Sequence, residues 1–289
     1  MEREAIGKKI DELVNEVIEA LKKELGHCIE SIMLFGSYTF GRISLERPNV
    51  NMLIFLKENA SGRDYLKIGE IFYSTSKKYK DSFSVKIDSL PFRFGFPTEK
   101  GKLQLVLAPN IINMVERTQH PPFGIPCNVL GGMKKTRKVV FGSDPLADIE
   151  VRYEKKDVVR WAMFDVGILF RNMLLRAPLT YDVEEHLDML VDESVELGKI
   201  ALVWGAEIFL DEEEWKKGRH IELIKDKDKL IEFYRNIDKE MEEAAKIILG
   251  ARKSFKDYVT DKEKAFKLYE AAYTAVQKVF LKVLSEMKQ

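Results

Sequence analysis

The spacing of apolar residues changes at about residue 150, and this change limits the folds open to the chain. Before it, short apolar segments alternate with polar turns, as in FSVKID, where Phe83, Val85 and Ile87 share one face of a strand. After it, four long segments carry apolar residues at helical spacing, over 155–175, 183–210, 227–249 and 261–287. The sequence therefore predicts an α+β protein, with an α/β domain over 1–150 and an antiparallel helical bundle over 151–289.

Within the first 150 residues the pattern predicts a series of short elements. An amphipathic helix ends near Leu25, and we expect further helices over 63–80 and 111–119. Strands are expected over 29–35, 50–57, 83–88, 103–107 and 138–141. Six of the nine prolines fall between residues 91 and 126, so most of that segment is expected to be irregular loop, and its role stays open.

Composition excludes several classes of protein. Apolar residues make up 45% of the chain and charged residues 33%, which is typical of a globular protein. The amphipathic N-terminus has no signal-peptide core, and no apolar run is long enough for a membrane span, so we expect a cytoplasmic protein without a membrane partner. With 47 basic and 47 acidic residues, no electrostatic case exists for nucleic acid as a partner. Abundant Lys and Glu with few Gln suit a thermophile.

Cysteine and histidine usage gives no metal signature. Cys28 and Cys127 are too few for a disulfide framework and too far apart in the chain for a zinc knuckle. The four histidines are scattered without the spacing of zinc ligands. From spacing alone we therefore expect no structural zinc site.

The segment MLFGSYTFGRISLERPNVNMLIFL contains the main candidate ligand-binding residues of the first domain. Gly36 permits backbone angles that a side chain forbids and lets the chain approach a phosphate closely, and Ser37 adds a hydroxyl. Gly41 follows four residues after that serine. Asn49 and Asn51, two residues apart on the next strand, point to the same face and can converge on one ligand. This arrangement suits a nucleotide's phosphates.

The first 145 residues resemble the nucleotidyltransferase superfamily, the fold of DNA polymerase beta and kanamycin nucleotidyltransferase. The resemblance rests on Phe35-Gly36-Ser37, on Gly41 and on the preceding amphipathic helix. It implies a mixed sheet with flanking helices, ATP or another NTP as ligand, and two Mg²⁺ ions held by an Asp-x-Asp motif and a third aspartate. Here Asn-Val-Asn replaces Asp-x-Asp, so the Mg²⁺ site is expected to be weakened.

Three further residues belong to the expected site. Asp88, at the end of its strand, is the candidate for the third carboxylate, and so for catalysis and for the metal. Arg42 follows Gly41, whereas many superfamily members have an arginine just before that glycine. If the strand over 83–88 lies beside the strand over 50–57, Lys86 shares a face with Asp88. We hypothesise that the Lys86 ammonium partly replaces the missing metal charge by pairing with Asp88 or with a phosphate.

Other polar segments have simpler interpretations. Gly142-Ser143-Asp144-Pro145 is expected to be a plain turn. A cluster of basic residues is expected to form a solvated strand edge, and acidic residues on the second bundle helix a solvated face. The basic residues are Lys134, Lys135, Arg137 and Lys138, and the acidic residues are Glu184, Glu185, Asp188, Asp192 and Glu193. Five bundle aromatics, Trp161, Phe164, Phe170, Trp204 and Phe209, are expected in the core.

The helical half is similar to bundles that are fused to or paired with nucleotidyltransferases. Such bundles complete a substrate cleft or mediate dimerisation, which suggests a homodimer here. Three functions stay open. The favoured one is a catalytically impaired pseudoenzyme that binds a nucleotide or phospholigand in a regulatory role. The second is an active Mg²⁺-dependent nucleotidyltransferase acting on a small molecule or a protein hydroxyl, and the third is a dimeric scaffold without a ligand. The acceptor cannot be identified from the sequence.

Overall fold

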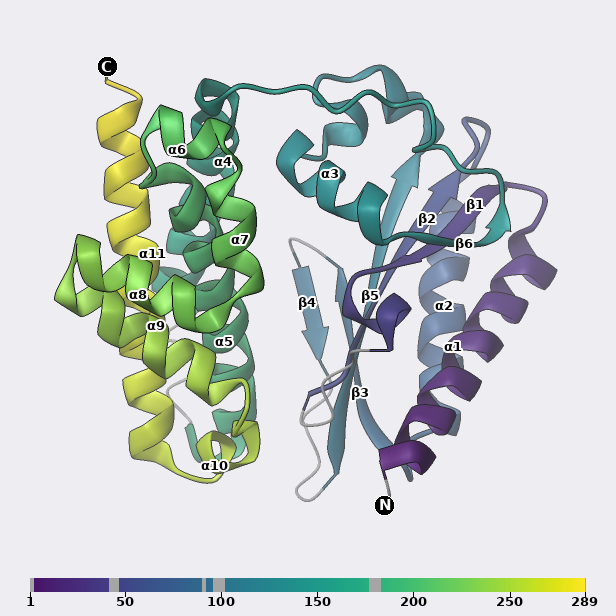
Figure 1. Ribbon diagram of the computed structural model, residues 1–289. Coiled ribbons are helices and arrows are strands. Elements are labelled where there is room, and N and C mark those ends of the chain that lie inside the picture. Colours follow the sequence, from purple (N-terminus) through teal and green to yellow (C-terminus); the bar gives the residue numbers. More distant parts are fainter. Residues whose placement is uncertain (1–2, 42–46, 90–91, 96–101, 177–182, 289) are drawn as a thin grey trace. The chain divides into compact units, whose positions relative to one another are not determined.

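The chain is described by a computed structural model that covers residues 3–41, 47–89, 92–95, 102–176 and 183–288. It divides into two compact units, Met1–Arg152 and Tyr153–Gln289. The first unit contains the strands and the second contains only helices among its described residues (Figure 1). The predicted α+β class is confirmed.

The first unit is built on a six-stranded mixed sheet with the order β4-β3-β5-β2-β1-β6. The strands are β1 (Ile29–Phe35), β2 (Asn49–Leu56), β3 (Phe83–Ser89), β4 (Phe92–Gly95), β5 (Leu103–Asn113) and β6 (Lys138–Gly142). β5 runs parallel to both β2 and β3, whereas β1 is antiparallel to β2 and β6, and β4 is antiparallel to β3. β5 therefore separates β2 from β3, so the condition considered above, that the strand over 83–88 lies beside the strand over 50–57, is not met.

The two faces of this sheet are covered by different helices (Figure 1). α1 (Arg3–Leu25) and α2 (Gly62–Lys78) pack on one face, because each carries an apolar stripe at helical spacing. On the other face, β1 and β2 side chains form a smaller core with residues that include Leu130 of α3 (Cys127–Thr136) and Phe123. The Phe55 and Phe123 rings meet edge to face, with centroids 5.1 Å apart.

The segment after residue 103 differs from its prediction. β5 continues to Asn113, where Ile111 and Ile112 still pair with β2, so the helix expected over 111–119 is wrong. Only a short 3-10 helix, η2 (Met114–Thr118), follows, and Asn113 caps it through its side chain. A second such turn, η3 (Pro122–Gly124), precedes α3. Apolar runs such as LVLAPNII cannot be divided between strand and helix from periodicity alone, which explains the error.

The second unit is a helical bundle whose main members are α4 (Lys155–Arg176), α5 (Val183–Ile208), α9 (Lys239–Ala251) and α11 (Lys262–Glu286). The remaining helices are α6 (Glu212–Lys216), α7 (Arg219–Lys225), α8 (Lys227–Ile237) and α10 (Phe255–Val259). The single helix expected over 227–249 is divided at Asp238, whose backbone is extended. Its carboxylate accepts hydrogen bonds from the N–H groups of Glu240 (2.7 Å) and Met241 (3.2 Å) and so starts α9.

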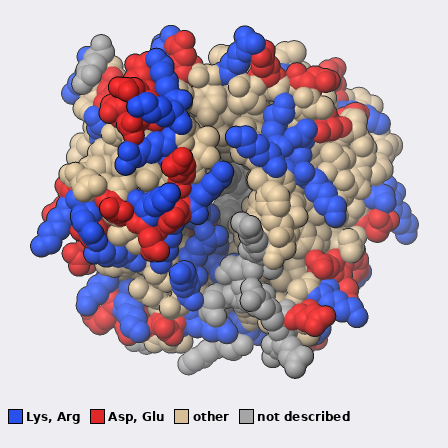
Figure 2. Space-filling view, viewed as in Figure 1, with Lys and Arg blue, Asp and Glu red and all other residues tan. Residues whose placement is uncertain are grey.

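On the face drawn in Figure 2, both units carry Lys and Arg interspersed with Asp and Glu. Over the full sequence, the 47 basic residues equal the 47 acidic residues in number. None of the helices in the described part of the chain is long and apolar enough to cross a membrane.

Candidate functional site

The Gly-Ser loop between β1 and β2 has the backbone that its glycines were expected to allow. Gly36 has φ 82° and ψ −156°, and Gly41 has φ 65° and ψ 18°. Both φ values are positive, a region that side chains disfavour. Between them, Ser37–Phe40 form a single 3-10 turn, η1, and the Ser37 side chain is exposed. The two glycines therefore open and close a compact turn at the end of β1.

Thr136, the last residue of α3, holds this loop. Its hydroxyl accepts a hydrogen bond from the Gly36 N–H at 3.2 Å. The Thr39 hydroxyl donates a hydrogen bond that is shared between the Gly36 carbonyl (2.7 Å) and the Thr136 carbonyl (2.8 Å). No signal for α3 was recognised in the sequence, so sequence reasoning missed Thr136 as a residue that supports the loop. The Lys134-Lys135 pair and the preceding turn prolines were the available hint of a helix end.

Tyr38 anchors the opposite side of the loop to α1. Its hydroxyl donates a 2.6 Å hydrogen bond to Asp11 Oδ1. Burial, followed by the hydrogen bond to the Asp11 carboxylate, raises the pKa of the Tyr38 phenol, so it stays protonated at neutral pH. A groove of about 630 Å³ runs here between α1, the loop and β6. The loop is thus fixed from both sides.

The two asparagines lie on the strand that faces this loop. Asn51 pairs with Phe35, the residue before Gly36, in the β1–β2 register. A Cβ atom added at Gly36 would come within 2.9 Å of Asn51 Nδ2, so the amide lies directly against the turn. Asn49 Oδ1 is buried and has no hydrogen-bond partner in the described part of the chain. Asn51 therefore lies against the Gly-Ser loop, and Asn49 keeps one acceptor available.

A set of polar residues continues from these asparagines across the sheet. Lys86 and Asn49 both pair with Val106, the residue on the strand between them, which puts their Cα atoms roughly 10 Å apart at ordinary strand spacing. Lys86 is 6% exposed. Its chain neighbour Val85 belongs to the core under α1 and α2, so alternation puts Lys86 on the opposite face. We call this set the polar face: Asn49, Asn51, Ser84, Lys86 and Gln104.

The other expected site residues are less completely placed. Arg42 lies outside the described residues. The backbone of Asp88 belongs to β3 and pairs with Arg93 of β4, but its side chain is outside the described part, so its roles in catalysis and metal binding stay predictions. Arg47, which the sequence reasoning did not select, is only 4% exposed although it lies two residues before Asn49. An arginine directly before Pro48 and the two asparagines is a sequence signal that could have been found.

The described donors do not fit Mg²⁺. This ion prefers charged oxygen ligands in octahedral geometry. Asn49 and Asn51 offer only neutral amide oxygens, and the nearby buried charges of Lys86 and Arg47 are positive. Among the described residues, the two amides by themselves therefore make a weak Mg²⁺ site.

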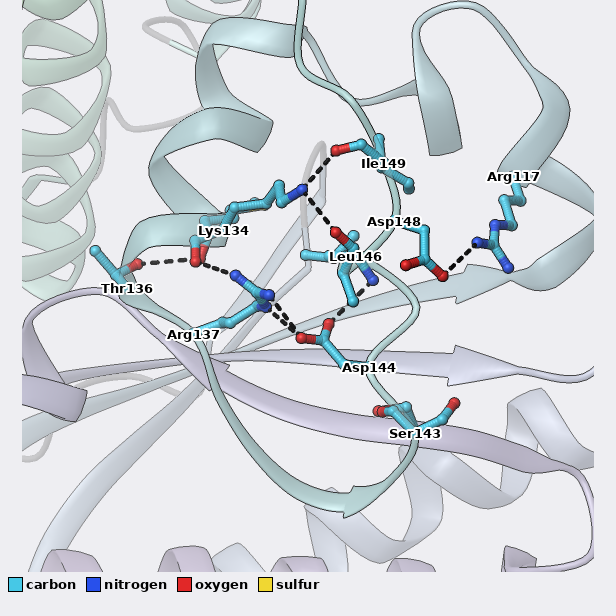
Figure 3. Close-up of polar contacts among 12 residues, drawn as sticks. Arg117, Lys134, Thr136, Arg137, Ser143, Asp144, Leu146, Asp148 and Ile149 are labelled. Atoms are coloured by element: carbon cyan, nitrogen blue, oxygen red, sulfur yellow. Dashed lines mark hydrogen bonds and ion pairs between the residues drawn. The ribbon is translucent and has the colours of Figure 1, made fainter.

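The second glycine-serine turn is part of the fold (Figure 3). Asp144 Oδ1 accepts a 3.1 Å hydrogen bond from the Leu146 N–H, and Arg137 Nη2 lies 2.6 Å from Asp144 Oδ2. Lys134 donates to the carbonyls of Ala147 and Ile149. Lys135 and Lys138 are exposed, but Lys134 and Arg137 are engaged in the fold, so the expectation of a fully solvated basic edge is wrong for these two.

In the helical unit, several polar side chains are more buried than expected. Asp188 and Asp192 are 9% and 3% exposed, so the expected solvated face is wrong for them. Phe164, expected in the core, is 70% exposed. Burial raises the pKa of Asp165 to about 6, although the hydrogen bond from the Trp204 indole acts in the opposite direction.

Comparisons with known proteins point to the same fold. No family model and no curated protein matches the chain. Among solved structures, the chain is similar to spectinomycin adenyltransferase AAD(9) from Enterococcus faecialis, determined with ATP and spectinomycin. The TM-score is 0.52 at 15% sequence identity, over 94% of this chain and 98% of that chain. The chain therefore has a nucleotidyltransferase-type fold with a C-terminal helical region.

Proposed function

We propose that the chain binds ATP or a related nucleoside triphosphate through the Gly-Ser loop and the polar face, that it does so without Mg²⁺, and that it serves a regulatory role. The observation that carries this proposal is the replacement of carboxylates by amides beside a buried lysine. Asn51 lies against the loop, and Asn49 lies two residues before it on β2. Lys86 lies on β3, on the other side of β5. A lysine ammonium in this position can contact a triphosphate oxygen directly.

Each part of the site has a role in this proposal. The Gly36–Gly41 turn lets backbone N–H groups and the exposed Ser37 hydroxyl approach a phosphate. The Lys86 ammonium neutralises part of the triphosphate charge, as a lysine does at many phosphate sites. The unpartnered Asn49 Oδ1 accepts a hydrogen bond from a ligand hydroxyl or amino group. Binding therefore uses side chains where related enzymes use metal ions.

The test is calorimetric titration of the full chain with ATP, once in EDTA and once in Mg²⁺. We expect binding in EDTA with an affinity that Mg²⁺ does not increase. Binding that requires Mg²⁺ would overturn the proposal in favour of an active transferase. Failure of ATP and the other three NTPs to bind in either buffer would leave a scaffold protein with the fold alone.

The second candidate is a working nucleotidyltransferase that acts on a small-molecule hydroxyl. It is favoured by the likeness to an adenyltransferase over nearly the whole chain. Release of pyrophosphate from ATP, with incorporation of radiolabelled AMP into a panel of hydroxylated small molecules and into the chain itself, distinguishes the two. The proposal predicts no incorporation above background.

A double substitution tests the alignment of the asparagines with the metal ligands. Asn49→Asp with Asn51→Asp adds two carboxylates on one face of β2. We expect the double variant to gain measurable Mg²⁺ affinity and to bind ATP more tightly with Mg²⁺ than in EDTA. Asn110→Asp with Asn113→Asp, on β5, is the control for added charge. Equal Mg²⁺ affinity in the two double variants would show that the alignment is wrong.

A further inference from the structure

Three metal-ligating side chains meet at a corner of the first unit that is remote from the Gly-Ser loop. His27 and Cys28 lie in the turn between α1 and β1, and Asp64 lies in the first turn of α2. An imidazole nitrogen, the thiol sulfur and a carboxylate oxygen all lie within 4.8 Å of one another. The His27 Nε2 and Asp64 Oδ1 atoms are 3.6 Å apart. Two different segments of the chain thus present three different donor types to one point.

The fold holds the cysteine firmly. Cys28 is 1% exposed, and its backbone N–H donates to the Leu25 carbonyl at the end of α1. Its own carbonyl accepts a 2.8 Å hydrogen bond from the N–H of Lys57, which follows β2. The sulfur is therefore fixed by α1 on one side and by the sheet on the other.

The aspartate is oriented by its helix. In the capping box of α2, Asp64 Oδ2 accepts hydrogen bonds from the Ser61 N–H (2.7 Å) and the Ser61 hydroxyl (2.8 Å). The other carboxylate oxygen, Oδ1, is the one that faces His27. The capping interaction therefore leaves one charged oxygen directed at the cluster.

We propose that His27, Cys28 and Asp64 bind one Zn²⁺ ion, with a water molecule as the fourth ligand. Zinc accepts sulfur, imidazole nitrogen and carboxylate oxygen in tetrahedral sites with ligand bonds of about 2.0–2.3 Å. Donors that lie within 4.8 Å of one another can reach such a geometry with small side-chain movements. Mg²⁺ and Ca²⁺ require oxygen ligands and do not suit the thiol and the imidazole.

Binding exchanges a proton for the ion. Zinc binds the thiolate form of a cysteine, so the Cys28 thiol has to lose its proton. The S–H proton leaves to solvent when the Zn–S bond forms, and the thiolate then balances one of the metal's two positive charges. Asp64 balances the other. The His27 side chain, 66% exposed, gives the ion access from solvent.

The site is separate from the nucleotide site proposed above. Cys28 precedes β1 and Gly36 follows it, so the seven residues of that strand keep the two apart by roughly 20 Å or more. Bound zinc would join the α1–β1 turn to the start of α2. Its expected effect is on stability, whether or not the chain binds a nucleotide.

The test uses the full chain and Cd²⁺, a zinc substitute whose bond to a thiolate gives an ultraviolet charge-transfer band. We expect the band on titration of the unsubstituted protein, its loss in Cys28→Ser, and its retention in Cys127→Ser, in which the other buried free cysteine is replaced. Absence of the band in the unsubstituted protein, or its loss in Cys127→Ser alone, would overturn the proposal.

A second variant covers the case in which Cys28→Ser fails to fold. His27→Gln changes an exposed side chain and is expected to fold normally while losing at least about 100-fold in Zn²⁺ affinity, because it removes a direct ligand. Added Zn²⁺ is expected to raise the Tm of the unsubstituted protein but not that of His27→Gln. His120→Gln, a change at an exposed histidine in another loop, is the control. Equal Zn²⁺ affinity in all three proteins would contradict the proposal.

Discussion

The two faces of the six-stranded sheet are made by the same strands but serve different needs. Toward α1 and α2, the alternating residues of the central strands are apolar and closely buried: Val50, Met52, Val85, Leu105 and Leu107. Their neighbours in the chain form the polar face, where Lys86 and Gln104 are 6% and 2% exposed. Burying apolar surface stabilises the fold, whereas burying amides and an ammonium costs free energy unless they are bonded. The apolar face is thus explained by folding, whereas the polar face is the one that the proposed function uses.

The largest effect is expected from the apolar face. Leu105→Ala removes most of a side chain that is fully buried, at the centre of the core under α1 and α2. We expect the free energy of unfolding to fall by about 3 kcal/mol, within the range known for buried leucines. Urea unfolding monitored by circular dichroism measures this change. ATP affinity of the fraction that remains folded is expected to stay the same, and a selective loss of ATP binding would contradict the division between the faces.

Gly36→Ala is expected to affect both stability and binding, because the residue is where the loop meets the polar face. Alanine at φ 82° is strained, and its Cβ would lie 2.9 Å from Asn51 Nδ2. Strain of this kind costs roughly 1–3 kcal/mol. We expect that loss in chemical unfolding together with the loss of ATP binding.

Gly62→Ala is the matched control for that variant. Gly62 lies in the first turn of α2, its φ is not positive, and a Cβ atom there meets nothing within 4 Å. We expect it to be neutral or stabilising by less than about 1 kcal/mol. If both glycine variants lose stability and ATP binding equally, the positive φ of Gly36 is not the cause of the loss.

Lys86→Met tests the contribution of the polar face to ATP binding. The substitution keeps the length of the side chain and removes its charge, so we expect ATP affinity in EDTA to fall about 10- to 100-fold, the value of a charge-assisted hydrogen bond. Stability is expected to fall as well, by roughly 1–3 kcal/mol, because the substitution also removes the interaction that the buried ammonium makes within the protein. Calorimetry and urea unfolding measure the two effects. Lys80→Met, at an exposed lysine, is the control, and an equal loss of affinity there would count against a specific contact.

The sequence predicted the elements that have strong local signals. β1 ends at Phe35 as expected, and the positive φ values of Gly36 and Gly41 follow from the need for a tight turn there. What it could not predict is the insertion of β5 between β2 and β3, because strand order depends on long-range pairing and not on local pattern.

The same limit applies to contacts made by distant residues. Asp64 meets Cys28, 36 positions earlier in the chain, only because α1 and α2 pack side by side on the sheet. Ligand-spacing rules apply to a contiguous motif and therefore cannot detect this cluster. The contact between Thr136 and Gly36 spans 100 residues and escaped detection for the same reason.

Thr136→Val should give the smallest effect. It keeps the branched shape but removes the acceptor of the Gly36 N–H bond, and a half-buried donor left without its partner costs about 1 kcal/mol. The bond from the Thr39 hydroxyl to the Thr136 carbonyl is unchanged, so the loop should loosen without unfolding. We expect a stability loss near that value and an ATP affinity several-fold lower. Thr136→Ser should restore both, and Thr118→Val, which alters an exposed hydroxyl, should change neither. If serine fails to rescue, the threonine contributes through packing of α3, and the loop is held by Thr39 and Tyr38 instead.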